Sequence, residues 1–275
     1  MIGNPRWLPA LFVLHLCFLP VATTVALAAT PSSVELEALT STEVRDLIGS
    51  GKTTIIVPIG GTEQNGPFIA LGKHNARVKM LAEKIALALG NALVAPVISY
   101  VPEGSVNPPT AHMRFTGTIT VPDAAFDKVV EYAARSFGQH GFRDIVLIGD
   151  HGGYQKNLQQ IADRLNREWA GNRVRVHAIP EYYRTAETTY ADALKAKGFN
   201  AEEIGTHAGL ADTSLTLALD PHLVRADRLS SERATGHAEG VAGDPRKSTA
   251  ELGRLGVDAI VEATVAAIKK AVASH

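Results

Sequence analysis

Residues 53–63 read Thr53-Thr54-Ile55-Ile56-Val57-Pro58-Ile59-Gly60-Gly61-Thr62-Glu63. The first seven form an apolar, β-branched run of strand length, which predicts a buried strand of a parallel sheet. The run ends in two glycines and an acid. Open α/β sheets bind ligands at the carboxyl ends of their strands, so this stretch predicts a layer of the fold and also a site at Glu63.

Strands and helices are predicted to alternate along the rest of the chain. Further strands are predicted at residues 92–98, 115–121, 144–149 and 173–179, and helices at 76–89, 122–139, 155–169, 213–219 and 249–273. Alternation of this kind implies right-handed crossovers and a mostly parallel sheet. The sequence therefore predicts an α/β fold.

The N-terminal segment is predicted to be a secretory signal peptide, residues 1–28. Arg6 precedes an apolar run that ends in the cleavage-site pattern Ala26-Leu27-Ala28. The alternative is a membrane anchor, because the run is nearly long enough to span a bilayer. Cleavage leaves residues 29–275 as a single domain without a stable membrane anchor, periplasmic in a Gram-negative bacterium and secreted otherwise.

Composition limits the partners and the metal ligands. The formal net charge is −1, and removal of Arg6 makes it one unit more negative, so the chain offers no basic surface for nucleic acid. The one cysteine, Cys17, lies within the predicted signal peptide. Any metal must then be held by nitrogen and oxygen atoms.

Short polar clusters supply the candidate site residues. Glu63 follows one predicted strand, and Asp150-His151-Gly152-Gly153 follows another. His74 precedes a helix and could equally be a surface or capping residue. His207 and Asp212 flank a helix entry, where Asp212 could simply be the N-cap. His112 is a weaker candidate.

Two carboxylates and two histidines suit a borderline divalent ion such as Zn, Mn or Fe, whereas Ca and Mg prefer oxygen ligands. Such an ion can activate water and polarise a carbonyl, and a further histidine can carry the proton to a leaving nitrogen. These parts favour amide hydrolysis. Motifs of serine hydrolases and nucleotide-binding loops are absent from the sequence.

Five motifs in order resemble the creatininase family of metal-dependent amidohydrolases, over roughly residues 36–271. They are Pro58–Gln64, His112–Thr120, Asp150–Gly153, His207–Ser214 and Gly240–Pro245. The resemblance implies a three-layer α/β/α sandwich around a mostly parallel sheet, and a homo-oligomer, often a hexamer. It also implies a dinuclear Zn or Mn site that opens cyclic amides or cleaves formamides.

The chain departs from the family pattern at the metal positions. Asn65 stands where the family has a histidine ligand, and His74 stands where it has the aspartate that bridges two metals. Asp212 is a shortened acid. A carboxylate can bridge two cations but a neutral imidazole offers one lone pair, so the sequence predicts one metal ion per chain.

These observations predict an exported hydrolase that cleaves a C–N amide bond of a small molecule, with metal-bound water as the nucleophile. Its predicted metal ligands are Glu63, His74, His151 and Asp212. His207 is expected to transfer protons. Asn65, Tyr154 and His112 are expected to contact substrate. The alternative is a non-catalytic small-molecule binding protein that has this fold and a degenerate metal site.

Overall fold

The computed structural model describes residues 1–3, 33–230 and 236–274. The fold described below is that of the unit Ser32–His275. Most of the predicted signal peptide, residues 4–28, lies outside the described residues, so that prediction is not tested. Within the described ranges, no helix has the length and apolar character needed to cross a membrane.

The core of this unit is a four-stranded parallel sheet in the order β2-β1-β3-β4. The strands are β1 (Thr54–Ile59), β2 (Ala92–Val94), β3 (Asp144–Gly149) and β4 (Arg175–Ala178). β1 and β3 pair along their whole length, from Thr54 opposite Asp144 to Ile59 opposite Gly149. Glu63 and His151 therefore leave the sheet at the same edge, as the sequence predicted.

The predicted strand at 115–121 does not form, and that prediction was wrong. Gly117 adopts a φ of +94° in the middle of the run, which breaks an extended conformation. Only single backbone bonds anchor the segment, from Ile119 N to Thr62 O and from Val121 N to Val101 O. The segment is instead a loop that follows the short helix η2 (Ala111–Arg114).

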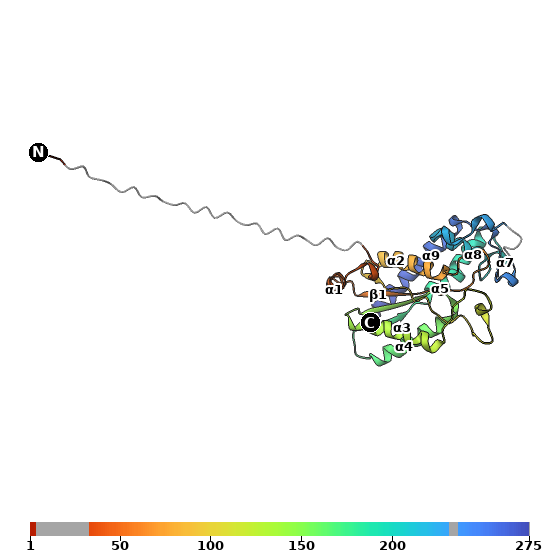
Figure 1. The fold of residues 1–275 in the computed structure, drawn as a ribbon, viewed down its shortest axis with the longest axis horizontal. Helices are drawn as coiled ribbons and strands as arrows, with labels where there is room; N and C mark the ends of the chain where they lie inside the picture. The colour runs from red at the N-terminus through yellow and green to blue at the C-terminus, as the bar shows by residue number, and fades with distance from the viewer. Residues whose placement is uncertain (4–32, 231–235, 275) are drawn as a thin grey trace. The chain divides into compact units, whose positions relative to one another are not determined.

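Helices cover both faces of the sheet, as Figure 1 shows. The longer helices are α1 (Ser41–Gly49), α2 (Lys73–Leu89), α3 (Asp123–Gln139), α4 (Gln155–Glu168), α8 (Leu210–Leu219) and α9 (Ala250–Ala273). A run of short elements joins β4 to α8: α5 (Glu181–Thr185), the π-helical η4 (Ala186–Tyr190), α6 (Ala191–Ala196) and α7 (Ala201–Ile204).

Side chains alternate between the two faces of the sheet, which builds two apolar cores. Ile56 and Ile148 pack with α2, α8 and α9 on one face. Ile55 and Leu147 pack with α1, α3 and α4 on the other. The arrangement is a three-layer α/β/α sandwich, so the predicted fold class is confirmed.

The start of α2 places basic residues at the carboxyl edge of the sheet. The helix begins at Lys73, three residues before the predicted start at residue 76. Asn75 Oδ1 accepts a hydrogen bond from Gly61 N at 2.9 Å, which ties the helix to the loop after β1. Lys73, His74 and Arg77 then fall on the first two turns and face the site.

Candidate metal centre

Glu63 is the residue at which the site's side chains converge. It lies four residues beyond β1, and its carboxylate is fully buried. Oε1 faces His74 Nε2 at 2.7 Å, and Oε2 faces His112 Nε2 at 3.2 Å. The two oxygens therefore belong to two different environments.

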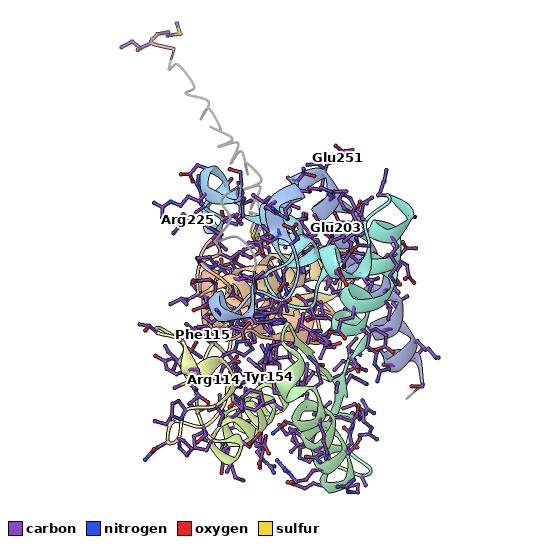
Figure 2. All side chains as sticks on the ribbon, turned by 90° about the vertical axis from the view of Figure 1, so that its right-hand side faces the viewer. Arg114, Phe115, Tyr154, Glu203, Arg225 and Glu251 are labelled. Atoms are coloured by element: carbon purple, nitrogen blue, oxygen red, sulfur yellow. The ribbon has the colours of Figure 1, made fainter. Side chains whose placement is uncertain are left out.

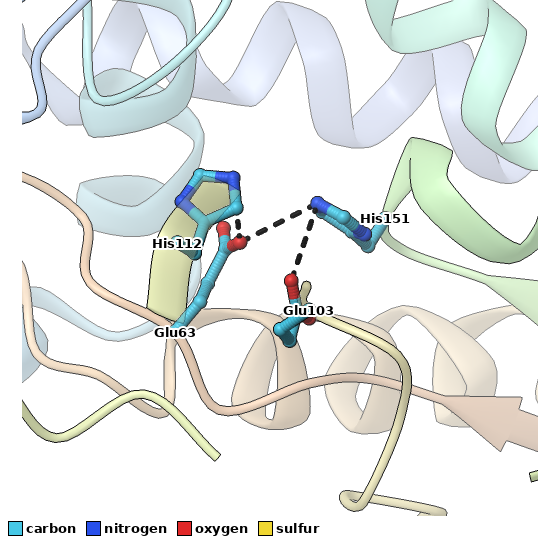
Figure 3. A group of neighbouring side chains, drawn as sticks. All are labelled: Glu63, Glu103, His112 and His151. Atoms are coloured by element: carbon cyan, nitrogen blue, oxygen red, sulfur yellow. Dashed lines mark ion pairs between the residues drawn. The ribbon is translucent and has the colours of Figure 1, made fainter. Parts of the chain in front are cut away.

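The Oε2 side holds a group of possible metal ligands, shown in Figure 3. Glu63, Glu103, His112 and His151 each direct one ligand atom into this space, and the four atoms all lie within 4.8 Å of one another. His151 Nε2 lies 3.4 Å from Glu63 Oε2 and 3.7 Å from Glu103 Oε2. This group contains two of the four predicted ligands, Glu63 and His151.

The loop between β2 and η2 supplies Glu103, and two neighbours fix its position. Glu103 N donates a hydrogen bond to Thr120 Oγ1 at 2.9 Å. Gly61 has a φ of +154°, and a Cβ there would lie only 2.7 Å from Glu103 Oε1. The second glycine after β1 therefore gives this carboxylate room to approach the end of the strand.

The donor atoms fit a divalent ion. Tetrahedral coordination at the usual Zn–N and Zn–O bond lengths separates ligand atoms by about 3.3–3.6 Å. The measured separations of 3.2, 3.4 and 3.7 Å bracket that range. Within the described ranges, Glu63 Oε2 and both oxygens of Glu103 are buried without a hydrogen-bond partner. Buried carboxylate oxygens without a donor are costly, and a cation between them would satisfy both acids.

The pKa values of Glu63 and Glu103 are shifted in opposite directions by their surroundings. Burial and the neighbouring charge of Glu63 raise the pKa of Glu103 to about 9. Burial alone would also raise the pKa of Glu63, but the charges of His74 and Lys73 outweigh it and hold this pKa well below its usual value. Glu103 therefore binds a proton where no cation replaces it, while Glu63 stays ionised.

Three histidines at the centre, His112, His151 and His207, are neutral near pH 7. Burial lowers the pKa of His151 to about 4, and burial also lowers the pKa of His112. Burial, followed by the charge of Lys73, lowers the pKa of His207 to about 4. A neutral imidazole has a free lone pair, which both metal binding and proton acceptance require.

The Oε1 side is closed by His74. Its Nε2 lies 2.7 Å from Glu63 Oε1, and its Nδ1 lies 2.6 Å from Asp150 Oδ2. Both partners are carboxylate oxygens, so both ring nitrogens donate. His74 then has no lone pair to offer an ion, and its predicted role as a ligand would require one of these bonds to break.

Asp212, the fourth predicted ligand, is also occupied. Its carboxylate accepts hydrogen bonds from Lys73 Nζ at 2.9 Å, Arg77 NH1 at 2.6 Å and Ala208 N at 2.9 Å. Burial alone would raise the pKa of Asp212, but Lys73 and Arg77 hold it well below its usual value. Asp212 lies outside the group around Glu63 Oε2 and acts here as the partner of two buried cations.

Arg77 completes this network. Its Nε and NH2 donate to Asp150 Oδ2 at 2.9 and 2.8 Å, while its NH1 reaches Asp212. Tyr182 OH donates to the other Asp150 oxygen at 2.8 Å. Three basic residues at the start of α2 thus face three acids from different parts of the chain. Glu63 follows β1, Asp150 follows β3, and Asp212 lies in α8.

His207, the predicted proton-transfer residue, lies between the two environments. Its Nε2 lies 3.0 Å from Gln64 O, and its Nδ1 lies 3.8 Å from Glu63 Oε1. A backbone carbonyl only accepts, so Nε2 carries the ring proton and Nδ1 presents its lone pair toward the centre. The His207 ring also lies 4.7 Å from that of His112.

Two of the three predicted substrate contacts lie inside the protein. Asn65 donates through Nδ2 to Glu63 O at 2.9 Å and Ala70 O at 3.3 Å, which fixes the loop after β1. Tyr154 is fully buried, with its hydroxyl 2.9 Å from Ile59 O and 2.6 Å from Gly60 O. Figure 2 labels Tyr154 among the side chains of the fold. Of the three, His112 alone lines the cavity at the site.

That cavity has a volume of about 520 Å³, within the range of small-molecule sites. Lys73, His112, His151 and His207 line it. Apolar and aromatic side chains of α5, η4, α8 and α9 line it as well: Tyr182, Tyr183, Tyr190, Leu215 and Ile260. The candidate centre therefore opens onto space that a small molecule could enter.

Comparison with known proteins identifies the family. A family model described as "Creatininase: Creatinine amidohydrolase" matches residues 37–268. The chain belongs to the creatininase family. It is therefore a member of a family of hydrolytic enzymes.

Curated relatives in this family carry out different reactions by name. A 3-dehydro-scyllo-inosose hydrolase of Thermotoga maritima is 27% identical over 208 residues, which cover 72% of this chain. The match spans 60% of that protein's own length. A Mycofactocin precursor peptide peptidase of Mycobacterium tuberculosis is 27% identical over 253 residues, covering 83% of this chain and 88% of the relative.

Solved structures of the family agree with the fold. A structure described as "Creatininase Mn" is 25% identical and superposes with a TM-score of 0.72. It covers 87% of this chain and 98% of the other. The family likeness confirms the resemblance that the five motifs predicted.

Proposed function

We propose that this chain is a metal-dependent hydrolase that cleaves a C–N amide bond, of the cyclic amide or formamide type, in a small molecule. The observation that carries the proposal is the convergence of one ligand atom each from Glu63, Glu103, His112 and His151, of which His112 and His151 also line the cavity. Three carboxylate oxygens of this group are buried without a hydrogen-bond partner among the described residues. The hydrolase names of the relatives support the reaction class.

The proposed ligands are Glu63 Oε2, Glu103, His112 Nε2 and His151 Nε2. Glu103 and His112 thus take the places that the sequence assigned to His74 and Asp212. Two nitrogens and two oxygens suit Zn or Mn. Coordination through His151 Nε2 puts its ring proton on Nδ1, so the 3.2 Å contact from Gly153 N–H to Nδ1 must lengthen on metal binding.

We propose one ion per chain. A second ion beside Glu63 Oε1 would have to displace His74, which is held by both Glu63 and Asp150. The cations Lys73 and Arg77 already neutralise Asp212 and Asp150. The positive charge that a second ion would bring is therefore supplied by the protein itself.

The remaining roles follow from positions around the ion. A bound Zn or Mn ion would supply Lewis acidity, which polarises a carbonyl and lowers the pKa of water. His207 presents Nδ1 toward the centre and is the proposed proton carrier, since a neutral imidazole can accept a proton and return it to the leaving nitrogen. His74 fixes the orientation of the Glu63 carboxylate through the short bond to Oε1.

The alternative is a non-catalytic small-molecule binding protein with this fold. Its support is the network at Glu63 Oε1, where Lys73, His74 and Arg77 compensate the acids without any metal. A screen of cyclic amides and formamides with added Zn or Mn separates the two. Metal-dependent turnover supports the hydrolase. Tight ligand binding without turnover at any metal concentration would favour the binding protein.

Two further proposals concern the cellular setting. The pattern at residues 1–28 supports export and cleavage after Ala28. The family resemblance supports a homo-oligomer. Mass spectrometry of exported material tests the first, and light scattering tests the second.

A further inference from the structure

Lys73 is a buried cation with unused hydrogen-bond donors. It is the first residue of α2, and its side chain is 1% exposed. Within the described ranges its ammonium has one hydrogen-bond partner, Asp212 Oδ2 at 2.9 Å. Its next charged neighbour, Glu63 Oε1, lies 3.9 Å away. An ammonium carries three N–H donors, so two of them lack a protein acceptor.

The other two cations of the network differ in this respect. His74 donates from both ring nitrogens, and Arg77 donates from Nε, NH1 and NH2. These two hold the acids in place and have little left for a ligand. All three residues line the cavity, and among them Lys73 is the one with N–H donors that no protein acceptor takes among the described residues.

Lys73 and the candidate metal ligands lie at different oxygens of the same carboxylate, that of Glu63. Glu63 offers Oε2 to the proposed metal ligands and Oε1 to the side of Lys73 and His207. The charge of Lys73 also lowers the pKa of His112, His151 and His207, although burial is the largest cause of each shift. The ammonium lies 3.9 Å from the carboxylate that carries the proposed metal-ligand oxygen, on the side of its other oxygen.

We propose that Lys73 Nζ binds the carbonyl oxygen of the amide substrate and stabilises the negative charge that develops on it. This role rests on the proposed amide hydrolysis. Water oxygen bonds to the carbonyl carbon, the C=O electron pair moves to oxygen, and His207 takes the water proton. The pair then returns as the C–N bond breaks, and nitrogen leaves with the proton from His207. The products are an amine and a carboxylic acid, which releases its remaining proton to solvent; Lys73 then binds an oxygen of the resulting carboxylate.

A purely structural role is the competing explanation, since Lys73 neutralises Asp212. The variants Lys73→Met and Lys73→Met/Asp212→Asn separate the two roles. Lys73→Met removes one of the two cations beside Asp212. The double variant removes the lysine and the carboxylate charges together, and the side-chain oxygen of the introduced asparagine can still accept the hydrogen bond from Ala208 N. Lys79→Met, an exposed lysine of the same helix that pairs with Glu35, is the matched control.

The probe is acetate, titrated calorimetrically into chelator-treated protein, so that neither metal nor turnover enters the measurement. Wild type and Lys79→Met should bind acetate equally. Lys73→Met and the double variant should both bind at least about tenfold more weakly, the loss expected for a charge-assisted hydrogen bond. With the double variant as stable as wild type, that loss belongs to the missing donor and not to misfolding.

Two results would overturn the proposal: no acetate binding by wild type, or restored binding in the double variant. Failure of the proposed function looks different. It would show as absent metal binding or turnover while acetate still binds in a Lys73-dependent manner. In a metal-loaded enzyme that turns over an amide, Lys73→Met should lower kcat by about 10²–10³, as for loss of one oxyanion donor.

Discussion

His74 Nε2 lies 2.7 Å from Glu63 Oε1, and this bond occupies the side of the carboxylate that faces away from the proposed metal ligands. The other ring nitrogen is held by Asp150, so the imidazole fills the space beside Oε1 and leaves Oε2 to Glu103, His112 and His151. A histidine at the position of the family's bridging aspartate therefore does more than remove a ligand. Its two ring nitrogens lie against the carboxylates of Glu63 and Asp150, and in the proposed site this contact takes the place of a second metal ion.

The first prediction concerns that substitution. His74→Asp removes a buried cation between two acids, and breaking a buried pair of this kind typically costs about 3–5 kcal/mol. The variant should unfold at lower urea concentration than wild type in chelator. Added Zn or Mn should restore its stability and raise its metal content above that of wild type.

His74→Gln is the control for this prediction, because it removes the charge without adding a carboxylate. It should lose stability without gaining metal. If His74→Asp holds no more metal than wild type, the space beside Glu63 Oε1 is not a latent second position.

The second prediction tests the role of His207. His207→Ala should reduce turnover by about 10²–10⁴, the usual contribution of a positioned acid or base, while metal content stays unchanged. Metal analysis and kinetics on the same preparation make the measurement. Loss of metal together with activity would show that His207 is a ligand. His222→Ala, an exposed histidine away from the site, should change neither quantity.

The third prediction concerns acid stability. Lys73 and Arg77 hold the pKa of Asp212 below its usual value of 3.8, although burial alone would raise it. A carboxylate with a lowered folded-state pKa contributes stability above the unfolded-state pKa, and this contribution is lost as pH falls toward the folded-state pKa. The free energy of unfolding should therefore decrease as the pH falls below about 4.

Urea unfolding at a series of pH values, in wild type and Asp212→Asn, measures this effect. The variant should be less stable than wild type at neutral pH, and its stability should depend less steeply on pH in the acid range. Equal slopes in the two proteins would mean that Asp212 is not the group responsible.

Much of the fold was predictable from local sequence. The buried runs at 53–59 and 144–149 carry β-branched residues and end in glycine, which fixes strands and places Glu63 and His151 at one sheet edge. The run at 115–121 had similar composition, yet Gly117 turns it, and no strand in the described part of the chain pairs with it. Local pattern cannot report whether a neighbouring strand is present.

The site was predictable only in part, because its contacts join distant segments. Glu103 lies in a proline-containing loop with no regular pattern, and burial against Gly61 becomes visible only in three dimensions. Lys73 and Arg77 read as ordinary charges at a helix start. Their partner Asp212 is more than a hundred residues away in sequence. The sequence pointed to polar residues near the site, but it could not show which of the acids are paired with basic side chains in the fold.

The central claim is that one metal ion binds through Glu103 and His112 on the Oε2 side of Glu63, and not through His74 and Asp212. The most direct measurement is a Zn or Mn titration of chelator-treated wild type, Glu103→Gln and Asp212→Asn, followed by metal analysis. The account predicts one ion per chain in wild type, at least about tenfold weaker binding in Glu103→Gln, and little change in Asp212→Asn. Two ions per wild-type chain, or a loss of metal in Asp212→Asn with full binding in Glu103→Gln, would contradict it.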